Sequence, residues 1–301
     1  MESSHTMNQV EDGHKLLADG GERVEQLLAE SIDWSRLPDH LAEAAQYGVL
    51  GGGKRLRPIL VLTCCSAVSG REVDAAAAAT ALELVHCFSL VHDDLPALDD
   101  DELRRGRPTL HVHSGEPMAI LAGDLMLAMA FGVIATGPCP PNVRVSLVEE
   151  LATGTSDMVA GQVYDTIGGL PVDISPLDQV RLVHRNKTGA LIRTACRMGG
   201  LCGGASPEAM AALTQYGEAM GLMFQIVDDL LDITQSADHV GKATGKDAAL
   251  GKRTYPAVLA ESACQAEVDR LRDKATTAAK KLGDGGYPLQ CLAEVMAVRT
   301  R

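Results

Sequence analysis

An apolar run that ends at Val91 is followed by a dense group of aspartates. Within HDDLPALDDDELRRGRP, Asp93 and Asp94 are adjacent, and Asp99 follows six residues after Asp93. Carboxylates packed this closely repel one another and need a cation. Pro96 disturbs a helix at this point, and a helix that bulges or ends there would bring Asp99 back toward Asp93. Hard carboxylate oxygens that leave room for water suit Mg²⁺, so the group predicts a magnesium site.

A second aspartate group follows another apolar run, in FQIVDDLLD. Asp228 and Asp232 are four residues apart, so on a helix their carboxylates share one face, whereas Asp229 points elsewhere. A single acidic run is most often a solvated surface. Two such runs, each after a markedly apolar segment, favour a functional pair of clusters.

Basic residues near the two clusters indicate what a metal would serve. GGGKRLRP places Lys54 and Arg57 three residues apart after a glycine stretch, so both face one anion if a helix begins there. Metals in carboxylate cages together with scattered cations are what two diphosphate groups require. The remaining candidate cations are Arg104, Arg105, Lys187, Lys242 and Lys252.

Composition and turn residues predict the elements that position these side chains. Of 301 residues, 46% are hydrophobic and only 3% aromatic, so the core is mainly Ala, Leu, Val and Met, which suits helices. The stretch 143–148 alternates like a strand but continues into a helical pattern, so it is predicted to be helical. The predicted helices, punctuated by Gly and Pro, span residues 22–31, 38–49, 56–69, 72–95, 117–136, 142–164, 175–200, 207–234, 254–282 and 288–298.

The bulk properties exclude several classes of protein. A formal charge of −13 argues against a general nucleic-acid binder. Eight cysteines without a CxxC pair predict reduced, buried thiols in a cytoplasmic protein. The apolar run 75–91 carries Glu83 and His86, which predicts a buried helix and no stable membrane insertion. Residues 1–21 lack the pattern of a signal peptide and are predicted to form a flexible tail before one domain over 22–301.

Six blocks of the sequence resemble the trans-isoprenyl diphosphate synthases, the head-to-tail prenyltransferases. DDLPALD is similar to the family's first aspartate-rich motif in the DDxxxxD form typical of bacterial short-chain enzymes, and DDLLD is similar to the second. GGKRLRP, GQVYD, KTG and FQIVDD match further blocks in family order, between residues 50 and 256. The resemblance implies an all-α protein, a single large helical bundle around a central cavity (the isoprenoid synthase fold), and usually a homodimer.

The resemblance also implies roles for individual residues. The ligands of Mg²⁺ would be Asp93, Asp94, Asp99, Asp165, Asp228 and Asp232. The homoallylic site, which binds isopentenyl diphosphate, would be Lys54, Arg57, His86 and Arg105. The allylic site would be Arg104, Lys187, Thr188, Gln225, Lys242 and Lys252. The residues closest to the chemistry would be Asp93, Asp94, Asp99, Lys187 and Asp228.

The implied reaction is electrophilic. Metal ions and nearby cations stabilise the charge that builds on the leaving allylic diphosphate. The allylic cation then needs a dry apolar pocket, because water would quench it. The isopentenyl double bond attacks this cation and a proton is lost, so no nucleophilic Ser or Cys is required.

Phe88 is the candidate determinant of product length. It lies five residues before Asp93, about 7.5 Å deeper along a helix, with the small Ser89 beside it. A ring at this depth is either ordinary core or the floor of the substrate pocket. In related synthases an aromatic residue here, with the longer first motif, goes with farnesyl diphosphate. The resemblance therefore favours the fifteen-carbon product, with geranylgeranyl diphosphate as the alternative.

Four other functions use some of the same features. A terpene cyclase would leave GGKRLRP unexplained, and its cations need aromatic faces that this chain lacks. Glu83 and His86 form an E-x-x-H pair as in di-iron bundles, but a second pair occurs only in the N-terminal tail. His92 and Asp93 could begin the metal-binding motif of an HD-type phosphohydrolase, but that function would not use the second aspartate group. An inactive partner subunit of a prenyltransferase is disfavoured by the intact motifs.

Overall fold

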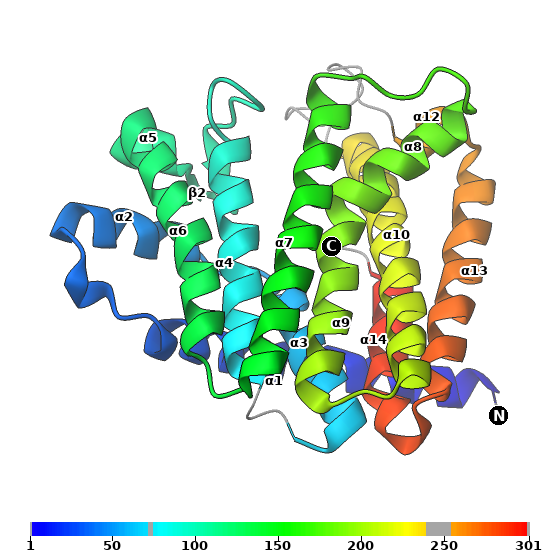
Figure 1. The fold of residues 1–301 in the computed structure, drawn as a ribbon. Helices are drawn as coiled ribbons and strands as arrows, with labels where there is room; N and C mark the ends of the chain where they lie inside the picture. Colours follow the sequence, from blue (N-terminus) through cyan, green and yellow to red (C-terminus); the bar gives the residue numbers. More distant parts are fainter. Residues whose placement is uncertain (1, 72–74, 239–253, 300–301) are drawn as a thin grey trace. The chain divides into compact units, whose positions relative to one another are not determined.

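The computed structural model describes residues 2–71, 75–238 and 254–299 (Figure 1). Lys242 and Lys252, both predicted to bind the allylic substrate, lie outside the described residues. The chain groups into two compact units. The first consists of Met1–Lys15, Thr153–Arg197 and Ser206–Arg301, and the second of Leu16–Ala152 and Met198–Ala205. The single domain predicted over 22–301 remains a prediction.

Helices account for nearly all regular structure of the described part of the chain, as the composition predicts. The N-terminal half contains α1 (Glu2–Ser31), α2 (Asp39–Val49), α3 (Leu56–Ser69), α4 (Ala76–Asp93), β1 (Leu103–Arg104), β2 (Arg107–Pro108), α5 (Leu110–Ser114), α6 (Glu116–Thr136) and α7 (Pro141–Thr166). A short 3₁₀ turn, Trp34–Arg36, joins α1 to α2.

The C-terminal half continues the pattern. Its elements are α8 (Pro176–His184), a π-helical turn (Arg185–Gly189), α9 (Ala190–Gly203), α10 (Pro207–Asp238), α12 (Tyr255–Val258), α13 (Glu261–Lys280), a 3₁₀ turn (Gly283–Gly286) and α14 (Tyr287–Ala297). The predicted helix over 175–200 is interrupted by the π-helical turn, and the one over 254–282 is divided into α12 and α13. The alternating stretch 143–148 is helical, as expected.

Local signals explain where several helices begin. Ser175 accepts a hydrogen bond from the backbone N–H of Asp178, and Pro176 occupies the first helical position of α8. The α3 helix is followed by Gly70 in the left-handed conformation (φ 70°), a common way for a helix to end.

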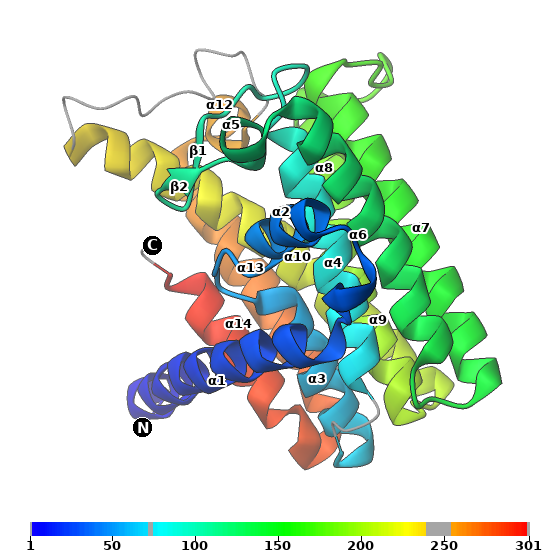
Figure 2. The same cartoon turned by 90° about the vertical axis from the view of Figure 1, so that its left-hand side faces the viewer.

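In the second unit, α4 and α6 lie side by side (Figures 1 and 2). Gly123 of α6 allows this approach, because a side chain there would collide with the imidazole of His92. The His92 Nε2 atom lies 3.1 Å from the Ile120 carbonyl oxygen. The interface therefore fixes the last turn of α4, immediately before the first aspartate group.

The α6 helix is long and apolar enough to span a membrane, although length and composition alone do not distinguish such a span from a packed helix. It packs against α2 and α4, and 33% of its most apolar segment is buried. This leaves part of an apolar helix on the surface of the unit.

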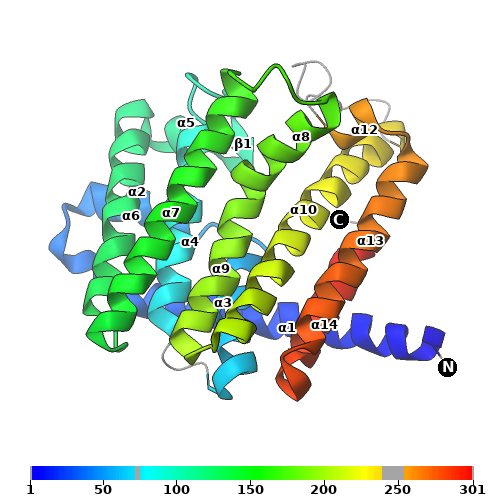
Figure 3. The same ribbon diagram turned by 45° about the vertical axis from the view of Figure 1, so that its right-hand side comes forward.

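In the first unit, α10 and α13 run side by side (Figures 1 and 3). Tyr216 of α10 is fully buried, and its hydroxyl donates to the Leu289 carbonyl of α14 at 2.8 Å. The second aspartate group thus lies on a helix whose core face is held by two neighbours.

The N-terminal segment differs from the prediction. Residues expected to form a flexible tail belong to α1, which begins at Glu2. Gln9 is buried, and Gly13 lies so close to the Cys291 carbonyl that a side chain would not fit there. Packing against α14 therefore accounts for order in a segment whose polar sequence alone does not indicate it.

Candidate diphosphate and metal sites

The first aspartate group lies where α4 ends. After Asp93 the chain makes a tight turn, and the Asp99 backbone N–H donates to the Asp93 carbonyl at 2.9 Å. The predicted return of Asp99 toward Asp93 is confirmed. Both side chains are partly exposed, whereas Asp94 is buried.

Asp94 is bound to Arg104. The guanidinium donates to both carboxylate oxygens, with Nε at 2.9 and 2.8 Å and Nη2 at 2.5 Å. Burial raises the pKa of the Asp94 carboxyl, and Arg104 opposes that rise. A predicted metal ligand and a predicted diphosphate ligand therefore neutralise one another.

Arg104 reaches Asp94 from a two-stranded hairpin formed by β1 and β2. Its loop residues, Arg105 and Gly106, have φ values of 54° and 75°, the positive angles typical of a type I′ turn. The Arg105 guanidinium donates to the carbonyl of Gly52 and packs against Gly53. The hairpin thus brings one arginine to the aspartate group and the next to the GGGK loop.

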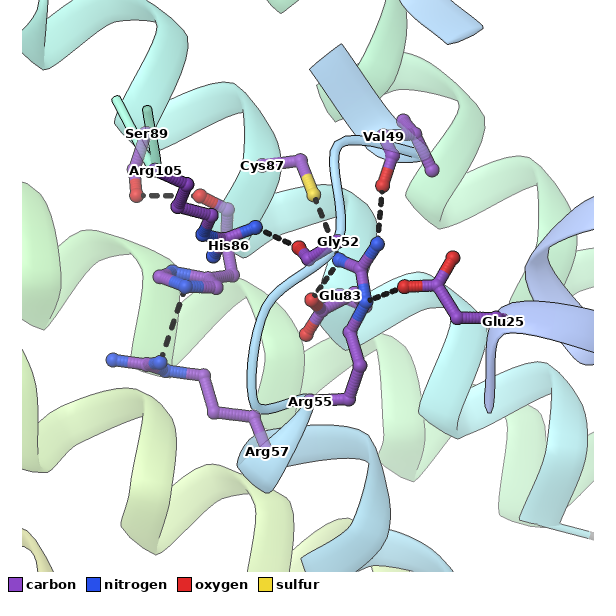
Figure 4. A network of polar contacts seen from close by, with 10 residues as sticks. All are labelled: Glu25, Val49, Gly52, Arg55, Arg57, Glu83, His86, Cys87, Ser89 and Arg105. Atoms are coloured by element: carbon purple, nitrogen blue, oxygen red, sulfur yellow. Dashed lines mark hydrogen bonds and ion pairs between the residues drawn. The ribbon is translucent and has the colours of Figure 1, made fainter. Parts of the chain in front are cut away.

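The predicted homoallylic residues lie around this loop (Figure 4). Arg57 Nη1 donates to His86 Nε2 at 3.2 Å, and Lys54 is exposed. Burial, followed by the charge of Arg57, lowers the pKa of His86 well below its usual range. His86 is therefore neutral at physiological pH and leaves the positive charge to its neighbours.

Two residues of this region have no role in the predicted prenyltransferase site: Arg55 and Glu83. The Arg55 Nη1 atom donates to Glu83 Oε1 at 2.6 Å, and both side chains are buried. Arg55 also adopts the left-handed conformation (φ 49°), which costs a non-glycine residue about 1–2 kcal/mol. Two features of the sequence could have indicated these residues. Arg55 lies between the predicted ligands Lys54 and Arg57, and Glu83 is a carboxylate inside an apolar run.

The predicted allylic residues of the first unit lie on and opposite the π-helical turn. Lys187 Nζ donates to Asp165 Oδ2 of α7 at 2.6 Å. Gly161, one turn earlier on α7, leaves room only for the backbone of Lys187. The wide turn and this glycine together set Lys187 against the GQVYD segment, as π-bulges often do at functional sites.

Thr188 is linked to the second aspartate motif by a chain of hydrogen bonds. Thr188 Oγ1 lies 2.8 Å from Gln225 Oε1, and Gln225 Nε2 donates to Asp229 Oδ1 at 2.9 Å. The Tyr255 backbone N–H donates to Asp229 Oδ2, also at 2.9 Å. Asp229 is buried, so this motif residue is a structural acceptor that ties α10 to the π-helical turn and to α12.

Asp228 and Asp232 differ from Asp229 in being partly exposed. The guanidinium of Arg299 contacts Asp228 and also lies over the Phe224 ring, 4.5 Å from its centroid. Nothing in the sequence marks Arg299, because it lies far from every motif. A third predicted metal ligand is thus paired with a cation.

Phe88 and Ser89 lie on α4, before the aspartates. Phe88 is 8% exposed and meets the His92 ring edge-on, with centroids 5.7 Å apart. Ser89 Oγ donates to the His86 carbonyl at 2.9 Å. The contact with His92 orients the Phe88 ring, and the predicted role of Phe88 in chain length stays a prediction.

The carboxylates suit a hard divalent ion in their donor chemistry. Among the described residues, no three His, Cys, Asp or Glu side chains gather closely enough to hold a metal. Asp94, Asp165 and Asp228 each contact a positively charged group, however, so their surroundings accept positive charge. Carboxylate oxygens are also the ligands that Mg²⁺ prefers.

Two rival chemistries do not agree with these contacts. Glu83 of the E-x-x-H pair is bound to Arg55, which removes it as a ligand of a di-iron centre. Burial raises the pKa of the Cys87 thiol to about 12, so it is not a nucleophile at neutral pH. None of the eight cysteines, all within the described ranges, forms a disulfide.

Comparisons with known proteins agree with the predicted family. The model of the polyprenyl synthetase family matches residues 38–284. A geranylgeranyl pyrophosphate synthase of Arabidopsis thaliana (number 11, chloroplastic) is 40% identical over 98% of this chain and 85% of its own. A chloroplastic geranylgeranyl pyrophosphate synthase of Capsicum annuum is 43% identical over 74% of this chain and 61% of its own.

Solved structures give the same result. An FPP/GFPP synthase of Zymomonas mobilis in its apo form superposes with a TM-score of 0.81 and 29% identity, covering 96% of this chain and 98% of the other. A geranyltransferase of Legionella pneumophila gives 0.80 and 30%, covering 98% of each chain. The isoprenoid synthase fold is therefore confirmed.

Asp228 and Asp229 offer a matched pair of substitutions. Asp229→Asn replaces one of two buried acceptors by a donor that faces the Tyr255 N–H, which costs about 1–3 kcal/mol. Its Tm in metal-free buffer should fall by about 2–8 °C. The Tm of Asp228→Asn should stay within about 1 °C of the wild-type value, as is usual for partly exposed sites. Its turnover number should fall at least about a hundredfold. Equal losses of Tm in calorimetry would contradict these separate roles.

Proposed function

The chain belongs to the polyprenyl synthetase family and is a trans-prenyltransferase, and on this premise we propose that it makes farnesyl diphosphate. It would condense isopentenyl diphosphate first with dimethylallyl diphosphate and then with geranyl diphosphate. The observation that carries the choice of product is the buried Phe88, held by His92 on the helix that ends in the first aspartates.

In this proposal the GGGK loop binds isopentenyl diphosphate. Lys54, Arg57 and Arg105 supply the charge, and a bidentate arginine pairs well with phosphate oxygens. His86 is neutral, so it accepts from Arg57 and keeps that guanidinium in place without adding charge. This end of the substrate stays bound while its double bond acts as the nucleophile.

The second diphosphate would be bound by the remaining cations and by metal ions that the carboxylates hold. Arg104, Lys187 and, outside the described residues, Lys242 and Lys252 would stabilise charge on the leaving group. Asp93, Asp94, Asp99, Asp165, Asp228 and Asp232 would hold Mg²⁺, which supplies Lewis-acid stabilisation of the same charge when bound. Thr188 and Gln225 would orient the diphosphate by hydrogen bonding.

Geranylgeranyl diphosphate is the second candidate product. It is favoured by the printed names of the plant relatives, which are geranylgeranyl pyrophosphate synthases. The FPP/GFPP synthase among the structural neighbours shows that the same fold serves other chain lengths. The two products differ by one condensation, so the depth of the pocket decides between them.

The test is a product assay with Mg²⁺, dimethylallyl diphosphate and isopentenyl diphosphate. We expect mainly the fifteen-carbon product from the wild type. Phe88→Ala should lengthen the product by at least one unit and keep the rate within about tenfold, because it removes volume and no charge. Phe131→Ala, an aromatic deletion on α6, is the control and should leave the product unchanged. Identical products from wild type and Phe88→Ala would mean that another residue limits the length.

A second prediction concerns the three ion pairs, Asp94–Arg104, Asp165–Lys187 and Asp228–Arg299. Mg²⁺ alone must compete with the cation of each pair, and a diphosphate alone must compete with the carboxylate. When both ligands bind, Mg²⁺ pairs with the carboxylate and the diphosphate pairs with the cation. Neither group is then left without a partner, so the binding of the two ligands is coupled.

Thermal denaturation with Mg²⁺, with methylenediphosphonate, and with both measures this coupling. The shift in Tm with both ligands should exceed the sum of the separate shifts by at least about 3 °C, the effect of roughly 1 kcal/mol of coupling. Ca²⁺ is the control, because its larger and more flexible coordination should couple less. Additive shifts would contradict the exchange of partners.

We also propose that the protein is a homodimer that uses the α6 surface. Ile120 and Leu121 of α6 are 44% and 56% exposed, and Val145 of α7 is 68% exposed. Apolar side chains on an otherwise apolar helix favour burial against another copy. Leu121→Glu should yield monomers in light-scattering chromatography, whereas Val172→Glu, at a 97% exposed position, should not. Dimers of Leu121→Glu would place the interface elsewhere.

We propose a cytoplasmic location. The support is the set of eight cysteines without a disulfide, which suits a reducing compartment. The plant relatives are named as chloroplastic proteins. Fractionation of cells that express a tagged chain would separate the two locations.

A further inference from the structure

Arg55 is a buried cation at the end of the GGGK loop (residues 51–55), where α3 begins (Figure 4). It lies between Lys54, which is exposed, and Arg57, which is partly exposed. The Arg55 side chain is 0% exposed, so it does not share the anion-binding surface of its neighbours. Arginine side chains are seldom fully buried, so the burial of Arg55 between two less buried basic residues needs its own explanation.

The Arg55 guanidinium joins three helices. Its Nε donates to Glu25 of α1 at 2.7 Å, and its Nη1 donates to Glu83 of α4 at 2.6 Å. Its Nη2 donates to the Val49 carbonyl, at the end of α2, also at 2.6 Å. Only the planar fork of arginine can reach acceptors in these three directions at once.

These bonds also hold the backbone of the loop. Arg55 is left-handed, and Gly52 and Gly53 before it have φ values of 75° and 124°. Three of these loop residues thus have positive φ values, and along this backbone Lys54 is exposed whereas Arg55 is buried. Arg105 contacts Gly52 and Gly53 from the other side. The loop is thus fixed by one arginine inside and by a second outside.

Glu83 balances the charge of both loop arginines. It binds Arg55 directly, and its negative charge opposes the lowering of the Arg57 pKa that burial causes. Glu83 Oε2 and Arg57 Nε are both buried without a hydrogen-bond partner. His86 lies three residues after Glu83 on α4 and holds the other end of Arg57. One helix therefore supports Arg57 through a charge and through a hydrogen bond.

We propose that Arg55 and Glu83 are positioning residues for the homoallylic diphosphate. They fix the 51–55 loop and the start of α3 so that Lys54, Arg57 and Arg105 converge on one anion, and they do not touch the substrate. The proposal rests on the proposed function, because it assumes that this loop binds isopentenyl diphosphate. It predicts a defect specific to one of the two substrates.

Arg55→Lys tests the proposal, because it keeps the charge and loses the fork. The KM for isopentenyl diphosphate should rise at least tenfold, whereas the KM for geranyl diphosphate and kcat should stay within twofold to threefold. Arg36→Lys, at an exposed arginine of the same unit, is the matched control and should change neither value. Equal increases in both KM values, or none, would overturn the proposal.

A second control separates positioning from general loss of stability. Leu28→Ala removes a fully buried side chain of α1 and lowers the Tm without altering the network. We expect Leu28→Ala to have about the same Tm as Arg55→Lys. Its KM for isopentenyl diphosphate should nevertheless equal that of the wild type. If Arg55→Lys does not fold, Glu25→Gln weakens one bond at a 38% exposed carboxylate and should raise this KM about threefold. An unchanged KM in that variant would also overturn the proposal.

Calorimetric titration with isopentenyl diphosphate does not depend on turnover. Wild type should bind it at least tenfold more tightly than Arg55→Lys. If the wild type binds but does not condense the substrates, the proposed function fails while this comparison still tests the loop. Equal affinities would refute the positioning role even in an active enzyme, and so would the absence of binding by the wild type.

Discussion

The constraint on which the structure depends is that its charged groups must be neutralised before any substrate arrives. Carboxylates and cations that would bind metal and diphosphate lie in ion pairs with one another, as Asp94 does with Arg104 and Asp165 with Lys187. A free carboxylate at such a buried position would shift toward its protonated form. Each pair places opposite charges side by side, so in the proposed function the binding of metal and diphosphate is an exchange of partners.

The rigid elements around these pairs serve to limit how far the groups can move. His92 packs on Gly123 and fixes the end of α4, and the hairpin carries Arg104 and Arg105 on a two-residue loop. In the other unit Asp229 fixes the π-helical turn through Gln225. Several of the groups predicted to bind ligand thus have a neighbour with a structural role, as a preorganised site requires.

The sequence predicted the helices well because apolar periodicity and Gly or Pro punctuation act locally. It also predicted the turn from Asp93 to Asp99, since Pro96 marks it. It did not predict that α1 begins at Glu2, because that order comes from packing on α14. It missed the pairing of Arg55 with Glu83 and of Arg299 with Asp228, because these partners are distant in sequence. Residue type and spacing show which groups can react, but not which groups hold them in place.

Asp228 and Asp229 are neighbours in the chain, yet a rotation of about 100° along α10 gives them different surroundings. One faces partly outward toward Arg299, and the other accepts two buried hydrogen bonds. Loss of the first aspartate should therefore leave the stability of the fold nearly unchanged, whereas loss of the second should lower it. In gene copies of this family that drift away from catalysis, the motif should decay unevenly. A lineage that keeps only the inner aspartate would then mark a subunit retained for assembly.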